Sequence, residues 1–280
     1  MSWKGSLGLN YRRDPHSSVP RTVVHDRHDG PLRVLASLYP EAPAVCHNVL
    51  VHPPGGIVGG DELAVDVTVA EGAHALVTTA GATRFYRSTG ASAKQSLQAL
   101  LAEGARLEWL PLETIAYSGC IAENHLRFAL APGAEMIGWD VLALGLPTSG
   151  QPFERGRFTQ SIELPGRWLE RGRIDAADTR LLDSPLGWAG QRVMGTLWFA
   201  TGAALPEPRR DMLLDAARAV LEAHPLKSSA GATSPQDGVI VLRVLAPRVE
   251  PLMNLLSAAW AQWRRAAWQL PCCTPRVWRT

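Results

Sequence analysis

Hydrophobic and polar side chains alternate with a period of two over much of the first 200 residues. In residues 63–69, four aliphatic side chains fall on one face and the residues between them on the other, the pattern of a half-buried strand. Similar runs occupy residues 32–39, 45–51, 73–79, 105–110, 125–131, 136–142, 158–164 and 193–200. Gly and Pro separate them at intervals of about 8–12 residues, the spacing typical of an all-β architecture.

The C-terminal third has a different periodicity. Residues 211–224 show helical spacing and end before Pro225, and residues 252–263 place Leu, Ala and Trp on one helical face. Residues 239–245 between them are typical of a strand, and residues 226–237 predict a Ser/Gly/Ala-rich loop. We therefore expect one domain, 1–280, with a β body over about 1–200 and a helical layer over about 205–270.

A short string recurs within the β body. VAEGA at 69–73 returns as LAEGA at 101–105 and as LAPGA at 130–134, with a poorer copy, LPG, at 164–166. Gly supplies the positive φ that a tight turn requires. The repeat predicts hairpins stacked into a solenoid-like or multi-sheet body, and a common turn sequence recurring by chance is the alternative. The expected fold class is mostly β, stacked sheets with about two α-helices in the C-terminal third.

Composition narrows the functional classes. The chain has 28 basic and 26 acidic residues, a net charge of +2, and this balance offers no broad basic surface for nucleic acid. No apolar run approaches the length of a membrane helix, and the N-terminus has no signal-peptide core. Four cysteines do not make a disulfide framework. The expectation is a cytoplasmic protein that engages neither membrane nor nucleic acid.

The segment 52–61, HPPGGIVGGD, is the most unusual in the chain. A phosphate-binding loop needs Gly-Lys-Ser/Thr before a helix, whereas here Asp61 and a predicted strand follow Gly60. The residues therefore favour a tight interstrand loop, and a hydrolytic or nucleotide-binding enzyme built on residues 53–61 is the alternative. The side chains of Cys46-His47 and of the histidines at 25 and 28 can bind metal ions, but their spacing in the sequence is not that of a known metal-binding motif. The sequence contains no motif typical of a catalytic site.

Several strings occur together with the Gly-rich segment in a fixed order. TAGATRFYRS follows at 79–88, LEWLPLETI at 107–115, WD at 139–140, GQPF at 150–153 and LER at 169–171, and PRVWRT closes the chain. In this order and spacing the chain closely resembles the urease accessory protein UreD family, also called UreH, over nearly its whole length. The HPPGGIVGGD string followed by RFYRS is highly specific to that family.

The resemblance implies a fold and a function. The family fold is a mostly β body of stacked sheets with a pair of helices, and its members have no catalytic activity. They bind apo-urease and the accessory proteins UreF and UreG, the latter a GTPase. The complex assists insertion of nickel into the urease active site. The resemblance therefore implies that the protein has no permanently bound cofactor. It also implies that Ni²⁺ is present only in transit, through an internal polar passage.

Four residues in the family-matching motifs are candidates for lining that passage: Asp61, Thr83, Asp140 and Glu170. The three carboxylates interrupt apolar surroundings, where an unpaired charge is costly, and Thr83 is a polar companion in a Gly-rich turn. The structural alternatives are a role in capping strands or turns for Asp61 and Asp140 and an ion pair with an arginine for Glu170. Cys272-Cys273 and the segment 226–237 are not family features, so the resemblance implies no role for them.

Overall fold

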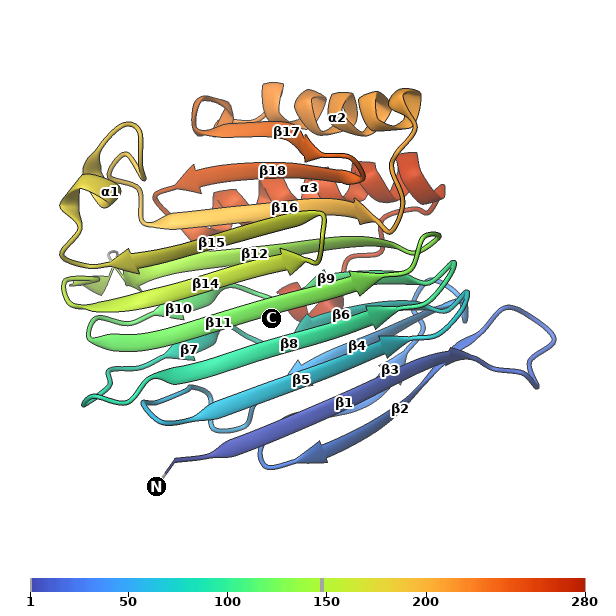
Figure 1. Ribbon diagram of the computed structural model, residues 1–280, viewed down its shortest axis with the longest axis horizontal. Helices are drawn as coiled ribbons and strands as arrows, with labels where there is room; N and C mark the ends of the chain where they lie inside the picture. Colours follow the sequence, from blue (N-terminus) through green and yellow to red (C-terminus); the bar gives the residue numbers. More distant parts are fainter. Residues whose placement is uncertain (1, 147–148, 280) are drawn as a thin grey trace.

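Two β-sheets lie face to face in the computed structural model, which describes residues 2–146 and 149–279 (Figure 1). Sheet A consists, in spatial order, of β15 (Trp168–Asp175), β14 (Gly156–Leu164), β11 (Cys120–Leu130), β8 (Ala93–Leu101), β5 (Glu62–Val69), β1 (Lys4–Arg13) and β2 (Thr22–Asp29).

Sheet B is the larger of the two. Its spatial order is β17 (Ala230–Gln236), β18 (Val239–Ala246), β16 (Val193–Thr201), β12 (Glu135–Leu146), β9 (Arg106–Leu110), β6 (His74–Thr79), β4 (Val45–Val51) and β3 (Arg33–Leu38). Short strands β10 (Thr114–Ala116) and β13 (Gln151–Pro152) pair with β12, and β7 (Thr83–Phe85) pairs with β10. The solenoid-like arrangement of stacked sheets confirms the predicted fold class.

Between β4 and β14 the chain alternates between the sheets and forms a coil of parallel strands. The recurring string forms the turns of this coil. The Ala102 amide donates to the Val69 carbonyl at 2.9 Å, and the Ala131 amide donates to the Leu101 carbonyl at the same distance. The repeat is therefore structural. The prediction of hairpins was wrong for the turns at 70–73, 102–105 and 131–134, because each links a strand of sheet A to one of sheet B. It is confirmed for the poorer copy at 164–166, which joins the antiparallel strands β14 and β15 of sheet A.

Helices α2 (Glu207–Glu222) and α3 (Val249–Trp268) pack together on sheet B, on the side away from sheet A. The apolar face predicted for residues 252–263 is buried, including Trp260 and Trp263. A further short helix, α1 (Thr179–Asp183), has no counterpart in the predictions, and single 3₁₀ turns span Lys227–Ser229 and Arg276–Arg279. Among the helices of the described residues, none combines the length and hydropathy needed to cross a bilayer.

The loop predicted at 226–237 was wrong in part, because β17 occupies Ala230–Gln236. Ala and Gly have low strand propensity, but the edge of β18 pairs with residues 230–233 and, after a register shift, with Gln236. Gly238, with φ of +84°, makes the connecting turn. Strands β17 and β18 thus extend sheet B within the interval 205–270 that was predicted to form a helical layer.

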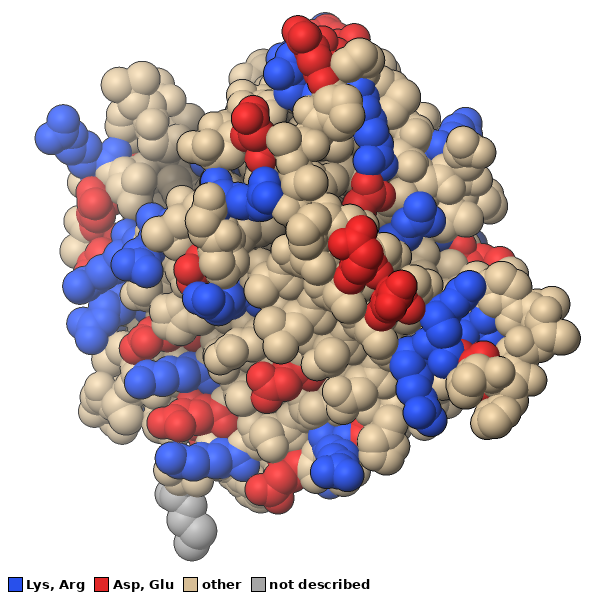
Figure 2. Space-filling view, turned by 45° about the vertical axis from the view of Figure 1, so that its right-hand side comes forward, with Lys and Arg blue, Asp and Glu red and all other residues tan. Residues whose placement is uncertain are grey.

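Strands β1, β2, β8 and β15 have no counterpart among the predicted runs. Polar residues interrupt the inward series of β8 and β15, whereas β1 alternates regularly and was missed. The outward side chains of neighbouring strands in sheet A stand beside one another in rungs set by the strand register. Lys4 lies beside Glu62, Glu62 beside Lys94, and Lys94 beside Glu123, so opposite charges alternate along one rung. Figure 2 shows positive and negative side chains interspersed on the face it presents. Sheet A therefore has a charged outer face and an apolar inner face.

Candidate functional site

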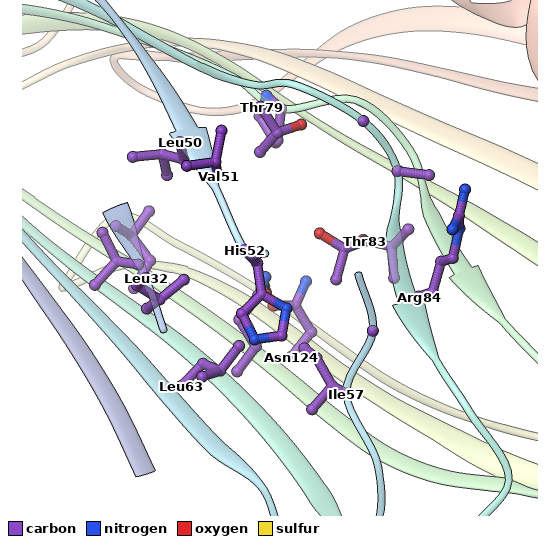
Figure 3. Close-up of a pocket in the computed structure, with 18 of the residues that line it drawn as sticks. Leu32, Leu50, Val51, His52, Ile57, Leu63, Thr79, Thr83, Arg84 and Asn124 are labelled. Carbon is purple, nitrogen blue, oxygen red and sulfur yellow. Dashed lines mark hydrogen bonds between the residues drawn. The ribbon is translucent and has the colours of Figure 1, made fainter. Parts of the chain in front are cut away.

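A cavity of about 310 Å³ lies between the sheets, beside the ends of β4 and β6. Inward-facing residues of sheet A, such as Leu63, Leu97 and Leu126, form one wall. The opposite wall includes Leu50, Trp109 and Asp140 of sheet B, and the loops 52–57 and 79–84 border the cavity (Figure 3). The Gly-rich segment and the TAGATR segment, which are separate in the sequence, thus meet at one site.

Steric constraints explain the glycines of segment 52–61. A Cβ on Gly56 would lie 2.0 Å from the Tyr86 ring, and one on Gly59 would lie 2.2 Å from the Ser88 hydroxyl. A bridge between Ile57 and Phe85 joins the two segments, and Phe85 is fully buried. The segment is therefore a close-packed interstrand loop, as its residues predict.

Asp140 is buried on β12 and faces the interior between the sheets. Its carboxylate accepts a hydrogen bond from Asn124 Nδ2 at 3.2 Å and another from Gln160 Nε2, both on sheet A. The pKa of Asp140 is raised from 3.8 to about 6, chiefly by burial; the Gln160 donor opposes the shift, the nearby Glu170 adds to it, and the Asn124 donor opposes it. Asp140 is therefore an acidic group with two neutral partners, accessible from the cavity.

The partners of Asp140 belong to a row of amides inside sheet A. Gln95, Asn124 and Gln160 occupy the same rung of neighbouring strands β8, β11 and β14. Gln95 Nε2 donates to Asn124 Oδ1 at 3.4 Å. The sequence predictions missed these residues. The sequence does contain a signal for them, because each amide replaces an apolar residue in the inward-facing series of its strand. Only the register of the strands shows that the three amides lie side by side.

His52 also lines the cavity and was not among the predicted site residues. Figure 3 shows its ring among Leu63, Ile57 and Asn124, within the lining. Partial burial lowers the pKa of His52, and the charge of Asp61 opposes this effect. A neutral imidazole has a free nitrogen lone pair, which is the form that binds a metal ion.

The structure brings together two of the four predicted site residues, since Thr83 and Asp140 line the cavity and Asp61 and Glu170 do not. Asp61 closes the end of the Gly-rich loop by accepting the Val58 amide at 3.0 Å and the Trp3 amide at 2.8 Å. This geometry matches the turn-capping alternative for Asp61.

Glu170 forms an ion pair with Arg243 of β18, which matches its structural alternative. Burial raises the pKa of Glu170, and Arg243 opposes the shift. The carboxylate still interacts electrostatically with Asp140. Glu170 therefore lies at the partly exposed edge of the sandwich, where β15 of sheet A approaches β18 of sheet B.

A second polar group lies on the opposite face of sheet B, beneath α3. The Glu41 carboxylate contacts His47 Nε2 at 2.6 Å and forms an ion pair with Arg264. The Glu108 carboxylate contacts His74 Nε2 at 2.8 Å and accepts a hydrogen bond from the Trp260 indole N–H at 2.6 Å. Arg264 is fully buried. His47 of the Cys46-His47 pair is thus held by a carboxylate. Within residues 2–146 and 149–279, no three His, Cys, Asp or Glu side chains gather with metal-site geometry.

Comparison with known proteins shows similarity over the whole chain. Residues 4–279 match the family model for the UreD urease accessory protein. The urease accessory protein UreD of Leptothrix cholodnii is 64% identical over 280 residues, covering 100% of each chain. The proteins of the same name from Albidiferax ferrireducens and Paracidovorax citrulli are each 62% identical over 278 residues, covering 99% of each chain. The matched range includes the two segments that border the cavity.

Proposed function

Because the chain belongs to the UreD family of urease accessory proteins, as its motifs predict, we propose that it is a non-catalytic maturation factor for urease. In this proposal it binds apo-urease together with partners of the UreF and UreG kinds, the latter a GTPase. It assists delivery of Ni²⁺, its cargo and not a resident cofactor, into the urease active site.

The single observation that supports a role in nickel delivery is the polar interior beside the cavity. Asp140 and the amides of Asn124 and Gln160 lie between two sheets whose facing surfaces are otherwise largely apolar. A buried carboxylate with two neutral partners and no cation weakens the fold, so packing alone does not explain it. Such a group attracts a divalent cation, and oxygen ligands release such an ion more readily than thiolates do.

The candidate passage combines the cavity with the carboxylates near it. Thr83 and Asp140 line the cavity, Asp61 lies at the end of the loop beside it, and Glu170 interacts with Asp140 from β15 at the edge of sheet A. In this proposal an ion moves between these oxygen groups, each of which holds it only transiently.

The test is the nickel content of urease matured with variants of this chain. We expect Asp140→Asn and Thr83→Val to lower nickel per urease while the complex with urease and the accessory proteins still forms. Asp66→Asn is the matched control, because Asp66 is an exposed aspartate on the outer face of sheet A. Normal nickel with an intact complex removes the tested residue from the passage, whereas loss of the complex assigns it a structural role.

No observation favours the alternative of a nucleotide-binding enzyme on residues 53–61. The Val58 amide in that loop already donates to Asp61, and the Gly56 backbone packs against Tyr86. A phosphate would therefore meet a carboxylate where it needs free backbone donors.

A further inference from the structure

One arginine of sheet B has no carboxylate partner. Arg106 of β9 is half-buried on the face of the sheet that carries the helices, and its guanidinium carbon lies 5.3 Å from the centroid of the Trp268 ring. Within residues 2–146 and 149–279, the Arg106 side chain makes no ion pair and no hydrogen bond. A guanidinium keeps its charge in proteins and carries five N–H donors, so Arg106 has donors available for a ligand.

The carboxylates around Arg106 are already engaged. The strand register places Glu135 of β12 directly beside Arg106. One oxygen of Glu135 forms an ion pair with Arg209 of α2, and the other accepts a hydrogen bond from the Trp268 indole N–H at 2.6 Å. Both oxygens of Glu108 likewise contact other groups beneath α3. Each oxygen of the two carboxylates therefore already has another partner.

A second positive charge lies near Arg106. Arg209 belongs to the first turn of α2, and its guanidinium also donates to the Ala267 carbonyl, near the end of α3, at 3.4 Å. Partial burial lowers the pKa of Arg106, an effect that Glu135 opposes. The Arg209 charge lowers this pKa further, and Glu108 opposes the shift. Packing thus holds two positive charges close enough to repel, and an anion beside them removes the repulsion.

The charge of this place fits a monoanion. Arg106 and Arg209 contribute two positive charges and Glu135 one negative charge, which leaves an excess of one positive charge. The deeper Glu108 has Arg264 as its counter-charge, 3.6 Å away. A guanidinium presents its N–H groups in a planar fork that matches the two oxygens of a carboxylate. A phosphate dianion would exceed the available positive charge.

We propose that Arg106 and Arg209 form a binding site for a carboxylate group, at the place where β9, α2 and α3 meet. Arg106 donates to both oxygens of the carboxylate, and Arg209 contributes its positive charge from α2. The Trp268 ring restricts the Arg106 guanidinium, so less freedom is lost on binding. The carboxylate comes either from a free ion or from an acidic side chain of a partner protein. The site lies on the opposite face of sheet B from the cavity, so it does not depend on the proposed function.

The test measures how fast phenylglyoxal, an arginine reagent, modifies Arg106 in the full chain, with peptide mass spectrometry as the readout. Acetate is the probe for a free carboxylate, and a hexaglutamate peptide is the probe for acidic side chains, both at constant ionic strength. We expect saturable protection of Arg106, about tenfold at roughly nine times the dissociation constant. Arg171, at an exposed position of β15, is the control and should react at an unchanged rate.

The two probes distinguish the sources of the carboxylate. Protection by the peptide at a much lower carboxylate concentration than by acetate assigns the site to an acidic protein segment. Protection by acetate at an equal or lower carboxylate concentration assigns it to a free ion. Three results would overturn the proposal: no saturable protection by either probe, equal protection of Arg171, or stronger protection by inorganic phosphate than by acetate.

Substitution of Arg106 separates a ligand site from a structural contact. Arg106→Gln should lower the saturation-transfer NMR signal of the bound probe at least fivefold, and Arg106→Lys should also lower it, because an ammonium lacks the planar fork. Arg171→Gln should leave the signal unchanged. Without a probe, Arg106→Gln should change the melting temperature less than Arg209→Gln, which breaks the ion pair with Glu135. An unchanged signal in Arg106→Gln, with a loss of melting temperature equal to that of Arg209→Gln, would make Arg106 structural and overturn the proposal.

Discussion

Asp140 gives the fold an unusual dependence on pH. Its pKa is about 6 in the folded chain against 3.8 for a free side chain, a difference of about 2 units or about 3 kcal/mol. A carboxyl group whose pKa is raised by folding binds more protons in the folded state than in the unfolded state. Between pH 4 and pH 6 its contribution to the free energy of unfolding therefore falls as pH rises.

Replacement of Asp140 by Asn removes this titration. Below pH 4 both proteins carry a neutral side chain, and the variant is less stable because its amide group faces the Asn124 and Gln160 donors, a cost of about 1–3 kcal/mol. Above pH 6 the wild type also carries the cost of its buried charge. The unfolding free energy of the variant minus that of the wild type should rise by about 3 kcal/mol between pH 3 and pH 7.

The assay is urea unfolding followed by tryptophan fluorescence at several pH values. The difference between variant and wild type is the informative quantity, because other carboxylates titrate too. Glu41, for example, has a pKa lowered through His47 and Arg264 despite its burial, so its contribution is lost as pH falls. A flat or falling difference for Asp140→Asn would refute the reasoning, because a falling one is the signature of a carboxylate held by a cation.

Three further predictions concern the interior and the chemistry. Arg264→Met removes the positive charge beside the buried Glu41 and Glu108 carboxylates and should lower the free energy of unfolding in urea by about 3–5 kcal/mol. Arg265→Met, at an exposed position of α3, should lower it little, and equal losses for the two variants would contradict this prediction. Gly56→Ala should lower the melting temperature because its Cβ meets the Tyr86 ring, and Gly81→Ala, with open space around it, should not; matching melting curves would show that the Tyr86 contact is not limiting. The purified chain should hydrolyse neither GTP nor urea, as measured by phosphate and ammonia release, and turnover that persists through purification would disprove it.

The local chemistry of the chain predicted many of its elements. Residues 63–69 alternate strictly, so one face must be buried, and β5 forms there. The face of α3 that carries Trp260 and Trp263 is buried for the same reason. The recurring Gly turns also follow from local conformation, since Gly72 and Gly104 both have φ of +64°. These features depend on neighbouring residues alone.

Other elements depend on a partner strand. Strand β17 has weak intrinsic strand propensity and forms because the edge of β18 supplies its hydrogen bonds. Strand β8 carries Gln95 on its inward face, which breaks the apolar series that a sequence pattern requires. In both cases, interactions with residues distant in the sequence override the local signal.

The sequence by itself determined the class of the fold, the solenoid-like repeat, the helices on the C-terminal side and, through its motifs, the family. It also indicated Thr83 and Asp140 as polar residues in apolar surroundings. Only the tertiary structure decided that His52, Trp109 and Asn124 line the same cavity as Asp140. It also decided that the amides of Asn124 and Gln160 donate to the Asp140 carboxylate. The physical reason is register: a polar side chain on one strand is an isolated irregularity until stacking aligns it with others, and this alignment is set by pairing between strands far apart in the chain.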